Sequence, residues 1–437
     1  MATLSTSPPQ SRLAGAFRSL RHRNFQLFFA GQLISLIGTW MQSVAESWLV
    51  YRLTGSSLLL GTVAFCAQVP IFLLSPVAGA VVDRRNRHRI VIATQTTSML
   101  LAFTLAMLTL SHVVRVWQIF VLASLLGFVN AFDIPARQAF IVEMVGKDDL
   151  MNAIALNSSM FNGARIIGPA IAGILVASIG EGWCFFGNSV SYIAVITGLL
   201  MMKVSPRELS RHTSALTAIK EGFQWVFNTK PIFFLLLLVG LVSLVGMPYA
   251  VLMPIFADRI LHSGARGLGI LMGFSGAGAL IGALALAAKS GLKGLGTWVM
   301  ASSACFGVFL AMFGFSRMFW VSAVLLIPVG MFMMVQMAST NTLIQSMVPD
   351  RLRGRVMSVY SMMMMGMAPL GALLAGGLSN RIGAPLTVAI GGFCSVLGSI
   401  WFGSRLPVLR GEARRLIIAQ AYAGGDPPQE MTTVRED

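Results

Sequence analysis

Charged residues are scarce in this chain of 437 residues. Asp, Glu, Lys and Arg together make up 11% of it, whereas a typical soluble domain contains about 25%. Hydrophobic residues make up 56%. So little charge cannot supply the polar surface of a soluble globular protein, and the composition therefore indicates a protein that crosses a membrane several times.

Motifs of catalytic and metal sites are also missing. The sequence has no G-x-x-x-x-G-K-[ST] phosphate-binding loop and no H-E-x-x-H zinc motif. All five histidines fall in loops or termini, and no two of the four cysteines have C-x-x-C spacing. We therefore expect no enzymatic activity, no cofactor, no metal site and no disulfide framework.

Long apolar runs fill most of the chain. A helix of about 20 apolar residues crosses the hydrocarbon core of a bilayer, and the runs here are continuous, unlike the alternating strands of a barrel. The first 24 residues lack the apolar core of a signal peptide. The predicted spans are residues 25–50, 57–82, 88–111, 116–136, 150–179, 183–203, 231–257, 267–288, 295–316, 318–346, 356–380 and 385–405.

The positions of Lys and Arg predict the orientation, because cytoplasmic loops are enriched in both. With the N-terminus inside, 25 of the 32 basic residues lie in cytoplasmic segments when those at span ends are counted with the adjoining loops, six lie in outer loops, and Arg165 is the one left inside the membrane. Both termini are then cytoplasmic. The net charge of +16 is thus mostly a topology signal, and we expect no nucleic-acid partner. The six outer residues are Arg52, Arg115, Arg259, Arg266, Arg317 and Arg381.

The two halves of the chain resemble each other. "LISLIG" at 33–38 returns as "LVSLVG" at 241–246, and Gly61 returns as Gly269, both 208 residues later. This predicts an all-α membrane protein of two pseudo-symmetric six-helix halves, an architecture of membrane transporters. An offset of 203 residues joins the pairs Val145/Val348, Ser158/Ser361, Gly163/Gly366, Gly168/Gly371, Ala172/Ala375 and Gly173/Gly376.

Four segments follow from this repeat. Residues 1–203 form the N-terminal half and residues 231–410 the C-terminal half. Between them, 204–230 is a cytoplasmic linker in which Leu216, Ile219, Phe223 and Val226 share one helical face, which predicts a short amphipathic helix. A simple linker with one packed turn is the alternative. Residues 411–437 are expected to form a flexible cytoplasmic tail.

The loop after the second predicted span reads "GAVVDRRNRHRI" (79–90). It resembles the loop 2–3 signature of the major facilitator superfamily, G-x-x-x-D-R-x-x-R-x-[RK]. In that superfamily the Asp latches the two halves, so the resemblance implies a role in gating. Simple anchoring of the loop in the cytoplasm would explain the arginines but not the spacing of Gly and Asp. The matching residues are Gly79, Asp83, Arg84, Arg87 and Arg89.

The fifth predicted span contains "GARIIGPAIAG", which is similar to the helix 5 motif of the antiporter branch of the same superfamily. Small residues on one face allow close helix packing, and proline favours a kink. The matching residues are Gly163, Gly168, Pro169 and Gly173.

Three further segments, 38–57, 130–145 and 152–173, resemble the bacterial exporter group that includes an enterobactin exporter and macrolide-efflux proteins. This resemblance implies proton-driven export of a small organic molecule across the bacterial cytoplasmic membrane. The chain departs from drug antiporters at "LASLLGF" (122–128), which has Gly127 but no Arg, so that residue's proton-relay role is not transferred. The second-half loop "AAKSGLKGLG" (287–296) has no acid, so we expect asymmetric gating.

Arg165 is a charge in the middle of a span, which costs about 2.5–3.5 kcal/mol on insertion scales. Asp133 lies at a similar depth in the preceding span, so we expect these two residues to form an ion pair. The pair is either a static link between helices or a functional site at which Arg165 contacts an anionic group of the substrate.

Glu46 is the second acid within a span and our candidate for carrying protons, because a partly desolvated carboxyl titrates closer to neutral pH. The alternative is an ion pair with Arg52 at the membrane edge. Met-rich segments at 331–337 and 362–367 suit either an adaptable pocket wall or ordinary lipid-facing packing. Candidates for lining the cavity are Trp40, Gln42, Asn130, Asn341 and Gln345.

Together these features predict a monomeric, twelve-helix major facilitator that exports a drug-like compound or siderophore by proton antiport. Uptake, or flipping of a lysophospholipid, is the alternative on the same fold. A non-transporting sensor or assembly partner is the alternative of another class, but the three charges within spans, Glu46, Asp133 and Arg165, would then be difficult to explain.

Overall fold

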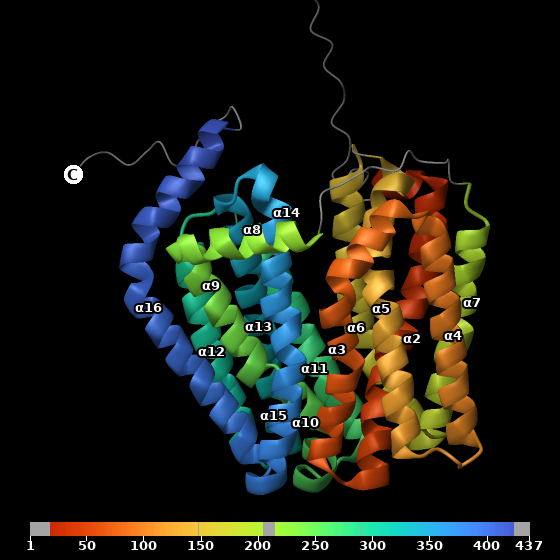
Figure 1. Cartoon of the computed structure of the whole chain (residues 1–437). Coiled ribbons are helices and arrows are strands. Elements are labelled where there is room, and N and C mark those ends of the chain that lie inside the picture. The colour runs from red at the N-terminus through yellow and green to blue at the C-terminus, as the bar shows by residue number, and fades with distance from the viewer. Residues whose placement is uncertain (1–17, 147, 204–214, 290, 424–437) are drawn as a thin grey trace, which may run out of the picture.

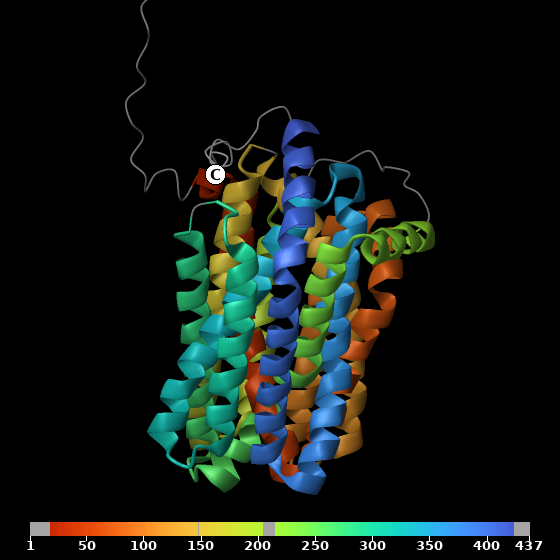
Figure 2. The same cartoon turned by 90° about the vertical axis from the view of Figure 1, so that its left-hand side faces the viewer.

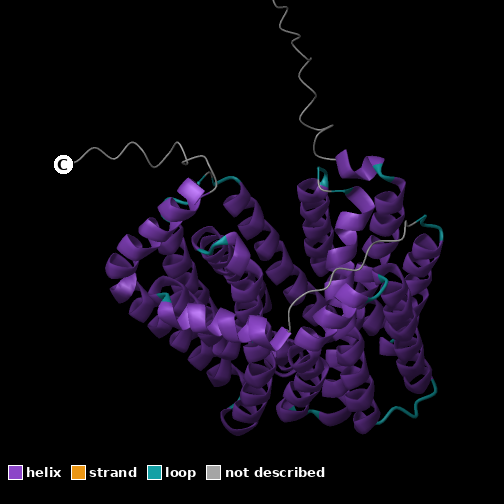
Figure 3. Ribbon diagram, turned by 45° about the horizontal axis from the view of Figure 1, so that its top comes forward, coloured by secondary structure: helices purple, strands orange, loops and turns teal. Residues whose placement is uncertain are grey.

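The computed structural model describes residues 18–146, 148–203, 215–289 and 291–423, and it is helical throughout, with no strand in these ranges (Figure 3). Within these ranges, twelve helices or helix series are long and apolar enough to cross a membrane. Each of them overlaps one of the predicted spans, so the sequence-based prediction of a twelve-helix all-α fold is confirmed.

The N-terminal half begins with a single 3-10 turn, η1 (Arg18–Arg21). Six long helices follow, and successive helices run in opposite directions (Figure 1). They are α2 (Arg23–Thr54), α3 (Ser57–Arg84), α4 (Arg87–Leu110), α5 (Val116–Val145), α6 (Leu150–Ser178) and α7 (Glu181–Leu200).

The C-terminal half has two spans built from several pieces. The seventh consists of α9 (Lys230–Leu241), η2 (Val242–Gly246), α10 (Tyr249–Ile255) and η3 (Phe256–Ile260), and the eleventh of α14 (Asp350–Ser361), η4 (Met362–Gly366) and α15 (Met367–Ile382). The segments η2, η3 and η4 are π-helical turns. The remaining spans are α11 (Gly264–Ala287), α12 (Leu295–Phe315), α13 (Phe319–Met347) and α16 (Ala384–Ala423).

Short polar turns separate the helices where the sequence supplies caps. Gly55 ends α2 with a φ of 60°, a left-handed conformation that glycine adopts without strain. The side chain of Ser56 then accepts a hydrogen bond from the Leu59 amide at the start of α3. Asn86 caps α4 in the same way, accepting from the Arg89 amide at 3.1 Å.

Helix α8 (Ala215–Asn228) occupies the segment between the halves and lies across the top of the C-terminal half in Figure 1. It packs against α14, where Glu221 and Arg355 form an ion pair. The side chains of Leu216 and Ile219 lie outside the described residues. The expected flexible tail from residue 411 is wrong for 411–423, because apolar residues continue there and Ile417 is buried, so α16 extends to Ala423.

The two halves form two helix bundles that lie side by side (Figure 1). We call the end at which α2 begins and α16 ends the basic end, at the top of Figure 1, and the opposite end the distal end. The main helix pairs joining the halves are α6 with α11 and α3 with α15. Toward the basic end the two bundles diverge (Figure 3).

Candidate functional site

Two glycine contacts join the halves near the distal end. A Cβ built on Gly61 of α3 would lie 2.3 Å from the Ala372 oxygen and 3.2 Å from the Gly376 Cα of α15. A Cβ built on Gly173 of α6 would lie 2.9 Å from the Gly269 Cα of α11. These four glycines are the repeat partners in the sequence, Gly61 with Gly269 and Gly173 with Gly376. The repeat therefore places equivalent backbone-to-backbone contacts on both sides of the interface.

A second pair of glycines packs helices within each half. A Cβ on Gly168 would lie 2.8 Å from the Ile37 oxygen of α2, and one on Gly371 would lie 2.2 Å from the Leu244 oxygen of η2. Pro169 is buried and its oxygen faces Gly269. Gly163, by contrast, has open space on the side where a Cβ would stand. Three of the four residues of the helix 5 motif thus lie at close helix contacts.

Arg165 lies near the middle of the membrane, about 22 Å along α6 from its basic end. Its guanidinium carbon is 5.8 Å from the centre of the Trp40 ring, and Trp40 meets Phe161 edge to face at 5.6 Å. A Cβ on Gly276 of α11 would lie 3.0 Å from the Arg165 oxygen. The half-buried Arg165 side chain therefore stands at the contact between the halves, and no acid in the described part of the chain pairs with it.

The predicted ion pair of Arg165 with Asp133 is wrong. Asp133 Oδ1 accepts hydrogen bonds from Thr94 Oγ1 at 2.7 Å and Gln95 Nε2 at 2.9 Å, and its Oδ2 lies 3.5 Å from Arg137 Nε. The depths of the two residues are similar, but α5 packs on α3 and α4 whereas α6 packs on α2 and α11. The i, i+4 spacing of Asp133 and Arg137 was the signal that sequence reasoning missed.

Glu46 is half-buried in α2, about 12 Å from the distal end of that helix. It neighbours Gln42, whose Oε1 accepts a hydrogen bond from Asn188 Nδ2 of α7 at 2.7 Å. The alternative ion pair with Arg52 is wrong, because Arg52 binds Glu181 at the start of α7 through two contacts of 2.7 and 3.2 Å. Glu46 is left without an ion-pair partner in the described ranges.

The loop 2–3 motif is divided between exposed and bound residues. Arg87 Nη1 donates to Glu143 Oε1 at 3.0 Å and to the Ala139 oxygen at 3.2 Å, which ties the start of α4 to α5. The side chain of Asp83 lies outside the described residues. Arg84 and Arg89 are exposed, and a Cβ built on Gly79 would meet no atom within 4 Å.

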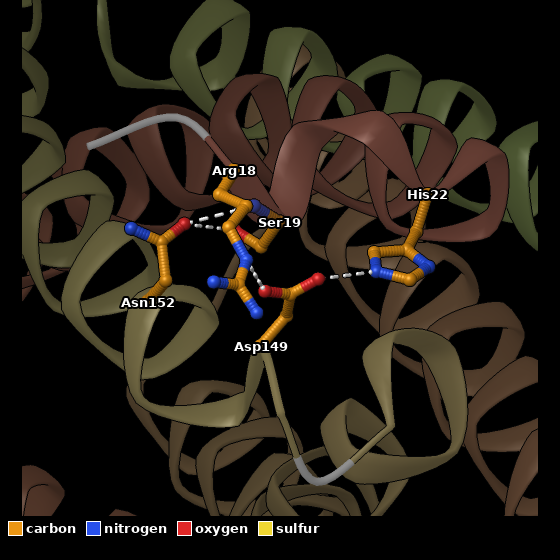
Figure 4. A network of polar contacts seen from close by, with 5 residues as sticks. All are labelled: Arg18, Ser19, His22, Asp149 and Asn152. Carbon is orange, nitrogen blue, oxygen red and sulfur yellow. Dashed lines mark hydrogen bonds and ion pairs between the residues drawn. The ribbon is translucent and has the colours of Figure 1, made fainter. Parts of the chain in front are cut away.

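A polar network at the basic end connects η1 to the turn before α6 (Figure 4). Asp149 pairs with His22, at 2.8 Å between Oδ2 and Nε2, and with Arg18. Asn152 accepts from the amide and the hydroxyl of Ser19. The hydrogen bond from His22, followed by those from Arg18, lowers the pKa of Asp149 below its ordinary value. The network holds the first described turn of the chain against α6.

At the distal end, a polar contact that the sequence did not predict joins the halves. Tyr51 Oη of α2 donates to Asp258 Oδ2 of η3 at 2.7 Å. The Arg259 guanidinium stacks on the Tyr51 ring at 5.7 Å and also covers Gly55, where a Cβ would lie 2.7 Å from Nη2. Only the positions of these residues near span ends hinted at this contact.

The remaining cavity candidates fall in different environments. Trp40 contacts Arg165, and Gln42 is buried against α7, as described above. Asn130 of α5 is half-buried. In α13, Gln345 is exposed and its Nε2 donates to Asn341 Oδ1 at 2.6 Å. The structure therefore pairs Trp40 with Arg165 of α6, and Glu46 with Gln42, which bonds to α7, while Asn341 and Gln345 lie near the basic end of α13. Within the described ranges, no group of His, Cys, Asp or Glu has the arrangement of a metal site.

The sequence of the chain is similar to those of known membrane transporters. A family model described as "transmembrane secretion effector" matches residues 14–428. The staphyloferrin A transporter of Staphylococcus aureus is 29% identical over 374 residues, covering 84% of this chain and 93% of the relative. The multidrug efflux pump Tap of Mycolicibacterium fortuitum is 30% identical over 363 residues, covering 80% and 88%.

A further relative, the enterobactin exporter EntS of Shigella boydii, is 25% identical over 396 residues, covering 90% of this chain and 93% of the relative. Among solved structures, the nucleoside transporter NupG superimposes with a TM-score of 0.67 at 14% identity, covering 88% of this chain and 98% of that one. At that identity the likeness concerns the fold.

Proposed function

The chain belongs to the transmembrane secretion effector family of the major facilitator superfamily, and from that premise we propose that it exports a siderophore or a drug-like small molecule in exchange for protons. Its relatives include a siderophore transporter, a siderophore exporter and a multidrug efflux pump. Their match over most of each chain supports a transporter of this kind.

The membrane orientation in this proposal has the basic end in the cytoplasm of a bacterium, with the protein acting as a monomer in the inner membrane. Arginines gather at that end in η1, in the α3–α4 turn and in the last turns of α16. Retention of basic residues on the cytoplasmic side supports this assignment.

The observation that carries the proposal is the environment of Arg165. A guanidinium near the middle of a membrane is costly, and such groups usually mark a substrate or ion pathway. This one has an aromatic neighbour, Trp40, but no acid in the described part of the chain. It stands where α6 meets α11 of the other half. A ligand with an anionic group, held between the halves, would supply the missing partner of Arg165.

Proton coupling is assigned to Glu46 in this proposal. Its carboxyl lies within the membrane, has a polar neighbour in Gln42, and lacks an ion-pair partner among the described residues. Such a group can alternate between a protonated and an ionised form as the site opens to either side.

Alternating access would use the glycine contacts. In the described conformation the halves touch at Gly61/Gly376 and Gly173/Gly269, near the distal end. Export requires these contacts to separate while the basic ends approach each other. Rocking of two repeat-related halves about a central site is the general scheme for this architecture.

The experiment uses inverted membrane vesicles that contain the protein and carry an inside-acid gradient. A fluorescent pH reporter records the gradient while siderophores, macrolides, lipophilic cations and lysophospholipids are added one at a time. We expect one class to collapse the gradient with the intact protein and not with Glu46→Gln. The matched control is Glu412→Gln, which removes an acid near the basic end of α16.

Each result has a separate meaning. Proton release that persists in Glu46→Gln refutes the role of Glu46 while leaving antiport intact. A gradient that no compound collapses contradicts export of these compounds by proton antiport and favours uptake or lipid flipping. Folded yield of each variant, measured by fluorescence-detected size exclusion, shows whether a lost signal reflects transport or folding.

A further inference from the structure

A cavity opens at the basic end of the C-terminal half, beside the last turns of α16. Its volume is about 520 Å³, and its walls come from α9, α12, α13, α16 and the short loop before α12. Figure 1 shows α16 leaning away from the other helices over its lower half and bending back toward them near this end, and Figure 2 shows it as the helix nearest the viewer. The tilt of α16 leaves the space.

The interior of the cavity is apolar and its mouth is cationic. Leu235, Leu343, Phe402 and Leu406 line the interior and are all buried. At the mouth lie three exposed cations, and none of the described residues that line the cavity is an acid. The cations are Lys293, Arg410 and Arg414.

One of these cations is held in place. Arg410 Nη2 donates a hydrogen bond to Thr297 Oγ1 of α12 at 2.7 Å. Thr297 itself lines the cavity. The guanidinium therefore bridges α16 and α12 at the opening and leaves its other N–H groups available to an anion.

The cavity crosses the boundary between hydrocarbon and headgroups. Counted from Ala384 at the distal end, Phe402 lies about 27 Å and Arg410 about 39 Å along α16. A hydrocarbon core of about 30 Å then contains Phe402 and leaves Arg410 at the level of the headgroups. Apolar lining and cationic mouth thus match the two layers of a membrane leaflet.

We propose that this cavity binds one anionic phospholipid, with an acyl chain on the apolar interior and the phosphate on Lys293, Arg410 and Arg414. Basic pockets between membrane helices on the cytoplasmic side bind anionic headgroups. A soluble anion would use only the mouth, and a neutral ligand would leave three cations without a partner. The lining residues all belong to the C-terminal half, so this lipid is distinct from a substrate held between the halves.

The test measures lipid binding by native mass spectrometry on delipidated protein in a neutral detergent. Phosphatidylglycerol and phosphatidylcholine are titrated separately. We expect Arg410→Gln/Arg414→Gln to weaken phosphatidylglycerol binding by about 30-fold, the equivalent of about 2 kcal/mol. The matched control is Arg405→Gln/Arg415→Gln, which removes the same charge from exposed positions of α16 that do not line the cavity. We expect it to change binding less than threefold.

A second variant tests the apolar part. Ala413 lines the cavity, and Ala413→Phe fills it while keeping all three cations. We expect this variant to weaken phosphatidylglycerol binding as well. Equal loss in the control double variant, equal affinity of the intact protein for phosphatidylcholine, or full binding to Ala413→Phe would each overturn the proposal. Competition by glycerol phosphate as strong as that by the lipid would also overturn it, in favour of a free-phosphate site.

Discussion

In the N-terminal half, buried Asp133 has three partners, Thr94, Gln95 and Arg137. The offset of 203 residues that joins Val145 to Val348 places Gln336 of α13 at the equivalent position of the C-terminal half. Gln336 is equally buried, yet both of its amide atoms lack a hydrogen-bond partner in the described structure.

The neighbours of these two residues differ in the same way. The offset of 208 residues pairs Gln95 with Ser303, and the Ser303 hydroxyl is also without a partner in the described ranges. The equivalents of Glu46 and Arg165 are Pro254 and Ala368. Among the described residues, the ionisable groups near the middle of a span, Asp133 and Arg165, therefore both lie in the N-terminal half.

The C-terminal half differs from the N-terminal half in the regularity of its helices. Its seventh and eleventh spans contain the π-helical turns η2, η3 and η4, whereas the described spans of the N-terminal half are regular α-helices. Such turns often mark functional sites, and η4 contains four methionines, which are flexible. We interpret the N-terminal half as the one that handles charge and the C-terminal half as the one that adapts its shape.

The largest expected difference between the halves concerns Arg165 and its equivalent, Ala368. Arg165→Met should lower transport by at least about tenfold, because a lost charge-assisted contact in a desolvated site costs more than 1.4 kcal/mol. Ala368→Met should change it less than about twofold, since that position holds no charge to lose. Initial transport rates per folded molecule, in vesicles, measure both.

Equal loss in the two variants would show that side-chain volume, and not charge, matters at this depth. Arg165→Lys separates the two further, because it keeps the charge while giving up the planar guanidinium that stacks on Trp40. Retained transport in Arg165→Lys would assign the effect to charge alone.

The next difference concerns stability. Asp133→Ala should lower the free energy of unfolding by about 3 kcal/mol, because Thr94, Gln95 and Arg137 lose a shared buried acceptor. Gln336→Met should stay within about 1 kcal/mol of the original chain or raise its stability, because it replaces an unpaired amide by an apolar group of similar length. Chemical unfolding in detergent gives both values.

A large loss in Gln336→Met would mean that Gln336 has partners, such as ordered water, that compensate its burial. The two halves would then differ in the kind of hydrogen-bond partner, protein groups for Asp133 and water for Gln336, and both buried groups would have partners.

Sequence reasoning predicted these helices well and their rotation poorly. Apolar runs and polar breaks determine where a helix enters and leaves the membrane, so the span boundaries differ by only a few residues for most helices. Side-chain direction changes by about 100° per residue, so depth could not reveal that Arg165 faces Trp40 and not Asp133. The repeated glycines were informative because their spacing reflects contacts that occur twice.

A third comparison uses those glycines. Gly173→Ala and Gly376→Ala each place a Cβ against backbone of the opposite half, 2.9 Å from the Gly269 Cα and 2.6 Å from the Ser57 oxygen. Both should weaken the described conformation, by about 1–3 kcal/mol each as overpacked contacts. The measurement places a cysteine at position 40 and compares how fast a thiol reagent modifies it from each side of the membrane. We expect both substitutions to increase the rate from the distal side relative to the rate from the basic side.

If the two substitutions change the accessibility by different amounts, the two contacts between the halves have similar geometry but contribute different free energies. The control is Gly163→Ala, where a Cβ meets open space. That variant should leave accessibility unchanged.

The smallest expected effect is at the basic end, where Asp149 anchors η1 and its equivalent in the C-terminal half is Leu352. Because its partners lower the pKa of Asp149, its contribution is complete above the ordinary Asp value of about 3.9. The contribution is lost as pH falls through the lower value in the folded protein. Asp149→Asn should therefore speed amide hydrogen exchange in residues 18–22 at pH 7, with the difference from the original chain disappearing in strong acid.

The neighbouring Asp148→Asn is the matched control, because Asp148 is exposed and its replacement should leave exchange in residues 18–22 unchanged. An exchange difference for Asp149→Asn that persists below the pKa of the folded carboxyl would contradict a charge-based anchor, since both chains are then neutral at this position. It would assign the network to the Ser19–Asn152 hydrogen bonds, which do not titrate. Either result decides whether the N-terminal half uses charge at its surface as it does within the membrane.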